Sequence, residues 1–291
     1  MEVDLSAVLN YYNDCWDERF LDGHNSISHA CHYGFYSDPS RNNINNTQSE
    51  YDKSKKQLNN KLIEIIDKKY DDKLIMLDAG CGYGGTMLDL SRYFINSNVY
   101  GITLTNAQIK CTNELLYLDT ANRTKVLYGN FNNDDFDIQN NQNHPIKYDI
   151  IYFIESICHS ECKETTIKIA LSMLNNNGKL IIFDYFENFD DNVVCDDLDN
   201  RTIDEIKVGM AIPSFINIKN IENITDNFNA YDVTNHILPG MEYSKCKAQK
   251  KIDNGNIQNE NIMKHLQSCI HMYNLHSKHI LNYNIVVIDK S

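Results

Sequence analysis

The side chains best suited to move a proton in this sequence are a carboxylate and an imidazole, Glu155 and His159, four residues apart. They follow residues 148–154 (YDIIYFI), an apolar run of the length expected for a strand buried on both faces. In an open α/β sheet, ligands bind beyond the carboxyl ends of the strands, so this pair would face a pocket. His159 could take a proton from a hydroxyl or an ammonium, because an imidazole titrates near neutral pH. Glu155 could orient His159 or stabilise a cationic intermediate; the alternative is that His159 only caps the helix that follows.

A second group of residues predicts a ligand-binding turn. Residues 74–77 (LIML) form a short apolar strand that ends at Asp78, and Gly80, Gly82 and Gly84 then alternate with other residues before an expected helix. A dinucleotide site spaces its glycines G-x-G-x-x-G, whereas here G-x-G-x-G-G follows the acid after one residue. The spacing argues against NAD, while a glycine turn in some other α/β protein stays open.

The elements that must position these residues alternate between strands and helices. Residues 98–103, 124–131, 148–154 and 179–186 are apolar runs of strand length, and stretches with helical spacing separate them. Such alternation predicts an α/β fold with a parallel sheet and right-handed crossovers.

Three stretches together resemble the class I S-adenosylmethionine-dependent methyltransferases. Residues 78–84 (DAGCGYG) resemble their first motif, and residues 101–108 (GITLTNAQ) match the GITLSxxQ motif of the sterol, tocopherol and cyclopropane-fatty-acid group. Residues 155–159 (ESICH) are similar to the ESxxH segment of that group. The resemblance implies a Rossmann-like, seven-stranded methyltransferase sheet with its last strand antiparallel, helices on both faces, and a helical and loop cap over the substrate.

By the same resemblance the cofactor would be S-adenosylmethionine, acting as the methyl donor. The glycine loop would wrap its methionine part, with Asp78 close to the amino group. Thr103 and Leu104 would lie against the ribose and adenine, and Asn130 would bond the adenine amino group unless it is an ordinary turn residue. The residues implied in cofactor binding are Asp78, Gly80, Cys81, Gly82, Gly84, Thr103, Leu104, Gln108, Asn130, Phe131, Glu155 and Tyr36.

The acceptor side of the site is predicted from aromatic residues outside the sheet. Residues 24–36 resemble the HxGYW-like segment that helps to close the cofactor site in the same group, with Tyr36 in the place of its tryptophan. Aromatic faces can shield a carbocation or bind a ring or a quaternary amine. The candidate substrate-binding residues are Tyr12, Trp16, Tyr33, Phe35, Tyr185 and His236. The expected acceptor is a small isoprenoid, sterol-like, aromatic or amine molecule; a prenyl diphosphate ranks lower because basic residues near the site are few.

The rest of the chain is expected to divide around this core. Residues 1–60 would form an N-terminal cap helix, an aromatic segment and, over residues 40–60, a polar loop. Residues 61–186 would form the cofactor-binding core and residues 187–216 a cap insertion. Residues 217–291 would complete the core with substrate-lining helices and the last strand.

Composition narrows the choice of partners. A net charge of −13 at pH 7 and a fourth strand without the N/D-P-P-Y signature disfavour a nucleic-acid methyltransferase. The first residues lack the basic start of a signal peptide and no run reaches the ~18 apolar residues of a membrane span, so we expect a cytoplasmic protein without an integral membrane segment. Nine cysteines without a C-x-x-C pair predict reduced thiols and no metal site. A catalytically silent S-adenosylmethionine-binding subunit remains an alternative, and the oligomeric state is not predicted.

Overall fold

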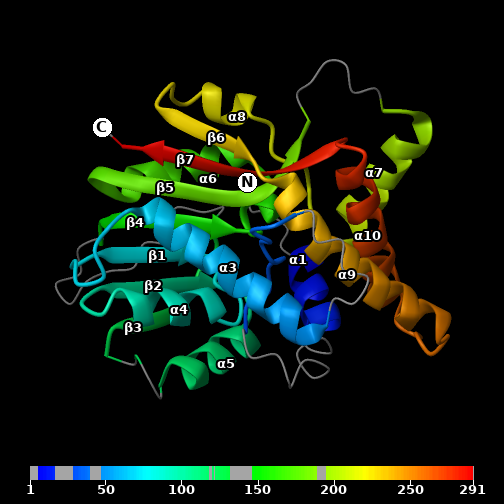
Figure 1. Ribbon diagram of the computed structural model, residues 1–291, viewed down its shortest axis with the longest axis horizontal. Coiled ribbons are helices and arrows are strands. Elements are labelled where there is room, and N and C mark those ends of the chain that lie inside the picture. Colours follow the sequence, from blue (N-terminus) through cyan, green and yellow to red (C-terminus); the bar gives the residue numbers. More distant parts are fainter. Residues whose placement is uncertain are drawn as a thin grey trace.

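The sheet at the centre of the protein has the strand order β3-β2-β1-β4-β5-β7-β6 in the computed structural model (Figure 1). The structure describes residues 6–16, 29–39, 47–117, 120, 122–131, 146–188 and 195–290. The strands are β1 Ile75–Ala79, β2 Asn98–Thr103, β3 Thr124–Tyr128, β4 Tyr148–Ile154, β5 Leu174–Glu187, β6 Phe228–Asp232 and β7 Leu281–Asp289.

The direction of the strands agrees with the sequence pattern. Strands β1 to β5 pair in parallel, with Asp78 of β1 opposite Gly101 of β2 on one side and Tyr152 of β4 on the other. Strand β7 lies between β5 and β6 and runs antiparallel to both. The predicted α/β fold, a seven-stranded sheet with an antiparallel last strand, is therefore confirmed.

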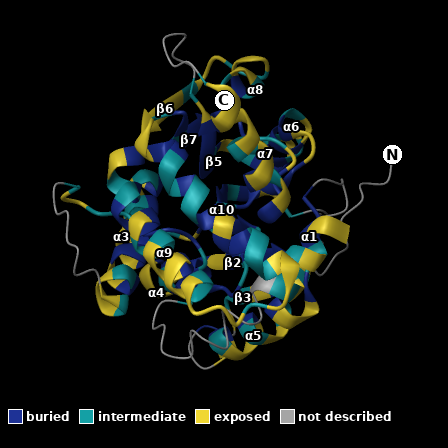
Figure 2. Ribbon diagram, turned by 90° about the vertical axis from the view of Figure 1, so that its right-hand side faces the viewer, coloured by how far each residue is buried: buried dark blue, intermediate teal, exposed yellow. Residues whose placement is uncertain are grey.

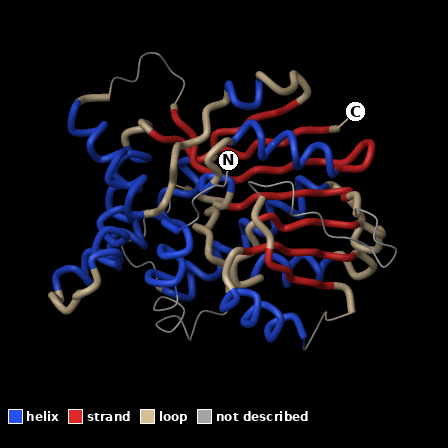
Figure 3. Tube along the Cα trace, turned by 180° about the vertical axis from the view of Figure 1, so that it is seen from behind, coloured by secondary structure: helices blue, strands red, loops and turns tan. Residues whose placement is uncertain are grey.

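Alternation along the strands builds one hydrophobic core on each face of the sheet. Met76 and Leu77 are neighbours in β1 and both fully buried, but they point to opposite faces and belong to different clusters. The cluster with Met76 includes side chains of α3 Gln48–Ile66, α4 Gly85–Tyr93 and α5 Asn106–Tyr117. The cluster with Leu77 includes side chains of α6 Lys163–Met173 and α8 Lys219–Glu222 on the face seen in Figure 3. Helices thus cover both faces, as expected.

A layer of helices lies beyond the carboxyl ends of the central strands (Figures 1 and 2). It consists of α1 Ser6–Tyr11, the π-helical turn η1 Tyr12–Trp16, α7 Asp197–Gly209, α9 Thr234–Asp253 and α10 Glu260–Ser277. Helices α7 and α10 approach closely because Gly209 has no Cβ; a Cβ there would lie 2.6 Å from the carbonyl oxygen of Lys264. This layer is the part of the protein that can close a site over the sheet.

One expectation is wrong, because the polar stretch predicted as a loop over residues 40–60 is helical from Gln48 on. The hydroxyl of Thr47 accepts the N–H of Glu50, and the Glu50 carboxylate accepts the N–H of Thr47, which makes a capping box. Leu58 is fully buried, so packing stabilises a helix that composition alone did not predict. The helix also crosses the expected boundary at residue 60.

Two further properties concern the described residues as a whole. None of their helices combines the length and the apolar character needed to span a bilayer. No disulfide joins the cysteines whose surroundings the structure describes.

Candidate functional site

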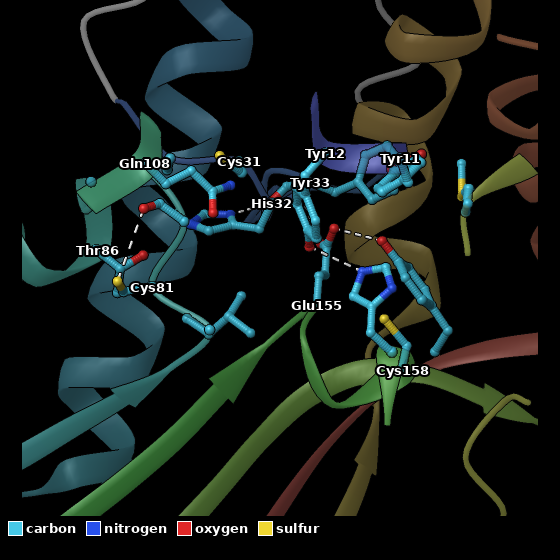
Figure 4. Close-up of a pocket in the computed structure, with 18 of the residues that line it drawn as sticks. Tyr11, Tyr12, Cys31, His32, Tyr33, Cys81, Thr86, Gln108, Glu155 and Cys158 are labelled. Carbon is cyan, nitrogen blue, oxygen red and sulfur yellow. Dashed lines mark hydrogen bonds between the residues drawn. The ribbon is translucent and has the colours of Figure 1, made fainter. Parts of the chain in front are cut away.

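A cavity lies over the carboxyl ends of β1 and β4, between the sheet and the helical layer (Figure 4). Together with its open mouth it encloses about 890 Å³ of empty space, within the roughly 300–1,000 Å³ of small-molecule sites. The predicted residues that line it are Asp78, Gly80, Cys81, Gly82, Gln108, Glu155, His159, Tyr12, Tyr33 and Tyr185. The structure therefore brings the two chemical groups of the sequence, the glycine turn and the Glu155–His159 pair, into one space.

A second hollow, of about 380 Å³, shares part of its wall with this cavity. The shared residues are Tyr12, Gly80, Gly82, Gln108 and His159. The predicted residues that line only the second hollow are Thr103, Leu104 and Phe131. The two hollows thus meet over the glycine loop, and His159 stands at their junction.

The glycine loop owes its shape to positive φ angles and close contacts. Gly80, Gly82 and Gly84 have φ of 100°, 52° and 79°, a region that side-chain-bearing residues rarely adopt. A Cβ on Gly80 would lie 2.4 Å from the Cβ of Ser156, so the loop packs directly on the turn after β4. Gly84 is the N-cap residue of α4 and lines neither hollow.

Asp78 is the penultimate residue of β1, beneath this loop, and its carboxyl group is buried. Burial raises the pKa of Asp78 to about 8, because a charge is poorly solvated there. Without a ligand, most Asp78 carboxyls are therefore protonated at neutral pH. A positive charge placed beside Asp78 would lower this pKa and restore the carboxylate.

The second hollow combines apolar walls with an oriented amide. The hydroxyl of Thr103 donates to Oε1 of Gln108, which leaves the Gln108 side-chain nitrogen as the donor toward a ligand. Leu104 and Phe131 supply the apolar wall, and the Phe131 ring packs edge-on against Phe153 at 5.4 Å between centroids. The apolar wall suits a flat ring, and the amide donor suits a neighbouring group that bears hydroxyls.

Glu155 is held by three donors from three distant parts of the chain. One oxygen accepts the Tyr33 N–H at 2.8 Å and the Tyr283 hydroxyl at 3.0 Å, and the other accepts the Tyr185 hydroxyl at 2.5 Å. Burial raises the pKa of Glu155 to about 7, and these donors oppose the rise by stabilising the carboxylate. The backbone of Glu155 has φ of 48°, an uncommon value outside glycine, which marks a tight turn at the end of β4.

His159 is oriented by two partners of opposite kind. Its Nδ1 lies 3.0 Å from the carbonyl oxygen of Ala211, which can only accept, so Nδ1 carries the proton. Its Nε2 lies 3.1 Å from the hydroxyl of Tyr12 and accepts from it. Burial lowers the pKa of His159 to about 4, so the ring is neutral at pH 7 with the lone pair of Nε2 toward Tyr12. The ring is therefore a neutral base whose Nε2 is occupied by the hydrogen bond from the Tyr12 hydroxyl.

Several lining residues were not predicted. They include Cys31, His32, Thr86, Cys158, Ser244, His265 and Cys269 (Figure 4 labels four of them). The crowding of histidine and cysteine next to Tyr33 in residues 29–33 is a local signal that could have indicated His32. Tyr283, which bonds Glu155, has no such signal because it lies 128 residues away.

Other predicted residues lie away from both hollows. Phe35 stacks on His236 at 4.6 Å between ring centroids, and Nδ1 of His236 donates to the carbonyl oxygen of Tyr36 at 2.7 Å. This cluster joins the N-terminal segment to α9, and none of its three residues lines the cavity. Asn130 is buried but lines neither hollow. The side chain of Trp16 is outside the described residues.

Among the described residues, the walls of the two hollows contain acidic side chains but no lysine or arginine. Asp78 and Glu155 contribute the carboxyl groups. No three histidine, cysteine, aspartate or glutamate side chains of the described residues are grouped to hold a metal ion. The wall therefore favours a neutral or cationic ligand over a phosphorylated one.

The strand order, the antiparallel β7 and the glycine loop between β1 and α4 define the class I S-adenosylmethionine-dependent methyltransferase fold. Residues 77–180 match the family described as "Methyltransferase domain". The match covers about a third of the chain, and the matched residues run from β1 into β5.

Known proteins resemble the chain in structure or in sequence. The mycolic acid cyclopropane synthase CmaA1, solved in complex with SAH and CTAB, has a TM-score of 0.77 and 14% identity, over 100% of this chain and 99% of that one. A sterol 24-C-methyltransferase from Eremothecium gossypii is 26% identical over 148 residues, half of this chain. A polyketide synthase, ThaQ, from Burkholderia thailandensis is 27% identical over 114 residues, 39% of this chain. The chain spans 37% of the sterol enzyme's length and 5% of the synthase's.

Proposed function

We propose that the protein transfers a methyl group from S-adenosylmethionine to a small-molecule acceptor. The observation that carries this proposal is the pair of hollows that meet over the glycine loop, with His159 at their junction. The second hollow has the apolar and amide groups that suit a nucleoside, and the larger cavity has a base, two carboxyl groups and several tyrosines. A methyl group transferred from the cofactor to the acceptor would cross this junction.

The residues around the loop fit the cofactor. The buried Asp78 carboxyl suits a ligand that brings its own ammonium group, because the two charges stabilise each other. Leu104 and Phe131 would hold the adenine, and Gln108 would hydrogen-bond near the ribose. Thr86, in the first turn of α4, lines the cavity where a helix N-terminus would stabilise the ligand's carboxylate.

The chain itself contributes orientation and proton removal. When bound, S-adenosylmethionine supplies an electrophilic methyl group on its sulfonium. His159 would accept the acceptor's proton at Nε2 once the acceptor has displaced the Tyr12 hydroxyl. Because burial makes the ring a weak base, the proton would leave as the methyl group arrives rather than before. Glu155 would ionise fully beside a developing positive charge, because its pKa is already near 7.

The lining supports a neutral or amine acceptor with an apolar or aromatic body. Tyr11, Met210 and Ile212 line the cavity beside His159 and offer aromatic and apolar contact. An isoprenoid, a sterol-like molecule, an aromatic compound or an amine fits this lining. A prenyl diphosphate fits less well because no lysine or arginine lines either hollow among the described residues.

A catalytically silent cofactor-binding subunit is the second candidate, and one observation favours it. The Tyr12 hydroxyl already occupies Nε2 of His159, as it would in a protein that binds the cofactor without using the base. The two candidates differ in turnover. A silent subunit would bind S-adenosylhomocysteine but never release it from S-adenosylmethionine with any acceptor.

The test combines binding with turnover. Calorimetry with S-adenosylhomocysteine should give saturable binding, and absence of heat would remove the proposed function altogether. An assay of S-adenosylhomocysteine release across amines, phenols, sterols and isoprenoid alkenes should then identify an acceptor. With that acceptor, His159→Ala should lower kcat roughly 10²- to 10⁴-fold, the usual contribution of a general base. The surface variant His271→Ala, whose ring pairs with Glu205, should be unchanged; equal kcat in both variants would exclude His159 as the base.

A further inference from the structure

The turn that carries Glu155 and His159 lies between two buried charges that the chemistry above does not use. Residues 155–160 form this turn between β4 and α6. Asp184 of β5 and Lys163 of α6 have 0% and 4% of their surface exposed. A charged side chain is rarely buried without partners, because removal from water costs several kcal/mol. The partners of these two charges therefore indicate what they hold.

Asp184 binds the backbone donors in the first half of the turn. Its Oδ2 accepts the N–H of Ser156 at 3.1 Å and the N–H of Cys158 at 3.0 Å. Its Oδ1 accepts the N–H of Tyr185 at 2.8 Å. These charge-assisted bonds anchor the turn to the neighbouring strand β5.

Lys163 binds the backbone acceptors in the second half. Its Nζ donates to the carbonyl oxygen of Cys158 at 2.8 Å and to that of Ser160. Lys163 is the first residue of α6, where the positive end of the helix dipole disfavours a cation by roughly 0.3–1 kcal/mol. Burial and the helix dipole both disfavour the charged form of Lys163. Its hydrogen bonds to the two carbonyl oxygens of the turn offset this cost.

We propose that Asp184 and Lys163 clamp the turn from its two ends, and that Lys163 is a positioning residue for His159. The inference rests on the proposed function, since positioning matters only if His159 acts as a base. The clamp holds the ring against the carbonyl of Ala211 while the acceptor replaces the Tyr12 hydroxyl, so Nε2 keeps its direction when its partner changes. Without the clamp, the ring would follow the departing Tyr12.

The charged and titratable groups around His159 are few, which makes the clamp measurable. Tyr11 and Tyr12 face the ring from the N-terminal segment, at 5.9 and 5.5 Å between centroids. Cys158 is its neighbour in the turn, and Lys163 faces it from α6, where the positive charge lowers the pKa of His159. Removal of the Lys163 charge should therefore change the pKa of His159 directly.

The experiment compares Lys163→Met with Lys168→Met, an exposed lysine of the same helix. Imidazole ¹⁵N chemical shifts report the tautomer and protonation of His159 without an acceptor. In the wild type and in Lys168→Met, we expect one Nδ1–H tautomer at pH 7 that stays neutral to about pH 5. In Lys163→Met, we expect a mixture of tautomers and a titration midpoint higher by roughly half to one pH unit. S-adenosylhomocysteine should bind all three proteins within about twofold.

An unchanged His159 tautomer in a folded Lys163→Met would overturn the clamp whatever the midpoint, because loss of the Lys163 charge raises the midpoint through space alone. If this variant does not fold, amide hydrogen exchange of the wild type decides instead. The N–H groups of Ser156 and Cys158 should then exchange as slowly as those of β4, and exchange at the rate of a surface loop would overturn the clamp. If the wild type shows the expected His159 tautomer and slow amide exchange in the turn but binds no S-adenosylhomocysteine, the proposed function fails and the clamp stands.

Discussion

The protonated state of Asp78 should make cofactor affinity depend on pH. With a pKa of about 8 in the free protein, Asp78 must lose its proton before it can pair with the ligand's ammonium group. The apparent Kd is then the intrinsic Kd multiplied by (1 + 10^(8−pH)), a factor of about 11 at pH 7 and about 100 at pH 6. S-adenosylhomocysteine should therefore bind about tenfold tighter at pH 7 than at pH 6, with release of about 0.9 proton at pH 7.

Isothermal titration calorimetry in buffers of different ionisation enthalpy measures both quantities. The control is Asp78→Asn, which keeps the shape of the side chain and cannot titrate. In Asp78→Asn the tenfold change should disappear, and a smaller slope can remain from Glu155 and Asp184, whose pKa values are about 7 and about 6. A wild-type Kd that is equal at pH 6 and pH 7 within twofold, with no proton released, would refute the reasoning.

The same carboxyl group should affect stability with a defined sign. The pKa of Asp78 is higher in the folded protein, about 8, than its ordinary value of 3.8, so the folded state binds the proton more tightly. Its contribution to stability is full below pH 3.8 and is lost as pH rises to 8. Between pH 5 and pH 7, chemical denaturation should show the wild type losing about 1.4 kcal/mol per pH unit relative to Asp78→Asn. A parallel pH dependence of the two proteins would contradict the raised pKa.

Two further changes test the loop and the covered base. Gly80→Ala should weaken S-adenosylhomocysteine binding more than tenfold, because φ of 100° strains an alanine and its Cβ would meet Ser156 at 2.4 Å. The control Gly255→Ala has φ of 72° but no atom within 4 Å of its Cβ; equal binding losses in both variants would contradict the role of the contact. Tyr12→Phe should speed the modification of His159 by diethyl pyrocarbonate about two- to tenfold, since one hydrogen bond of roughly 0.5–1.5 kcal/mol no longer covers Nε2. Mass spectrometry measures that rate, and an unchanged rate would show that Tyr12 does not cover the base.

The sequence predicted the parts of this protein that depend on local spacing. The apolar run before Asp78 and the glycines after it lie within a dozen residues, and their spacing alone indicated a strand, a loop and a helix. Repetition of that pattern indicated the parallel sheet, because each strand and helix is recognised from neighbouring residues. Glu155 and His159 follow a recognisable strand, so their place beyond its carboxyl end could also be predicted.

Polar stretches and distant partners were harder to predict. The capping box at Thr47 is a four-residue signal, but the burial of Leu58 that stabilises α3 depends on a core built by other elements. The aromatic cluster of Phe35 and His236 illustrates the opposite error. Their residue types suit a substrate site, yet they pair with each other and lie away from the cavity.

The sequence by itself determined the α/β order of elements, the glycine loop and the presence of a carboxylate and an imidazole after β4. Only the tertiary structure decided how those two groups behave. The donors that hold Glu155 come from Tyr33, Tyr185 and Tyr283. The hydroxyl that covers His159 comes from Tyr12, 147 residues away. The pKa of a buried group depends on which atoms surround it, and folding brings those atoms together from positions whose separation in the chain carries no pattern.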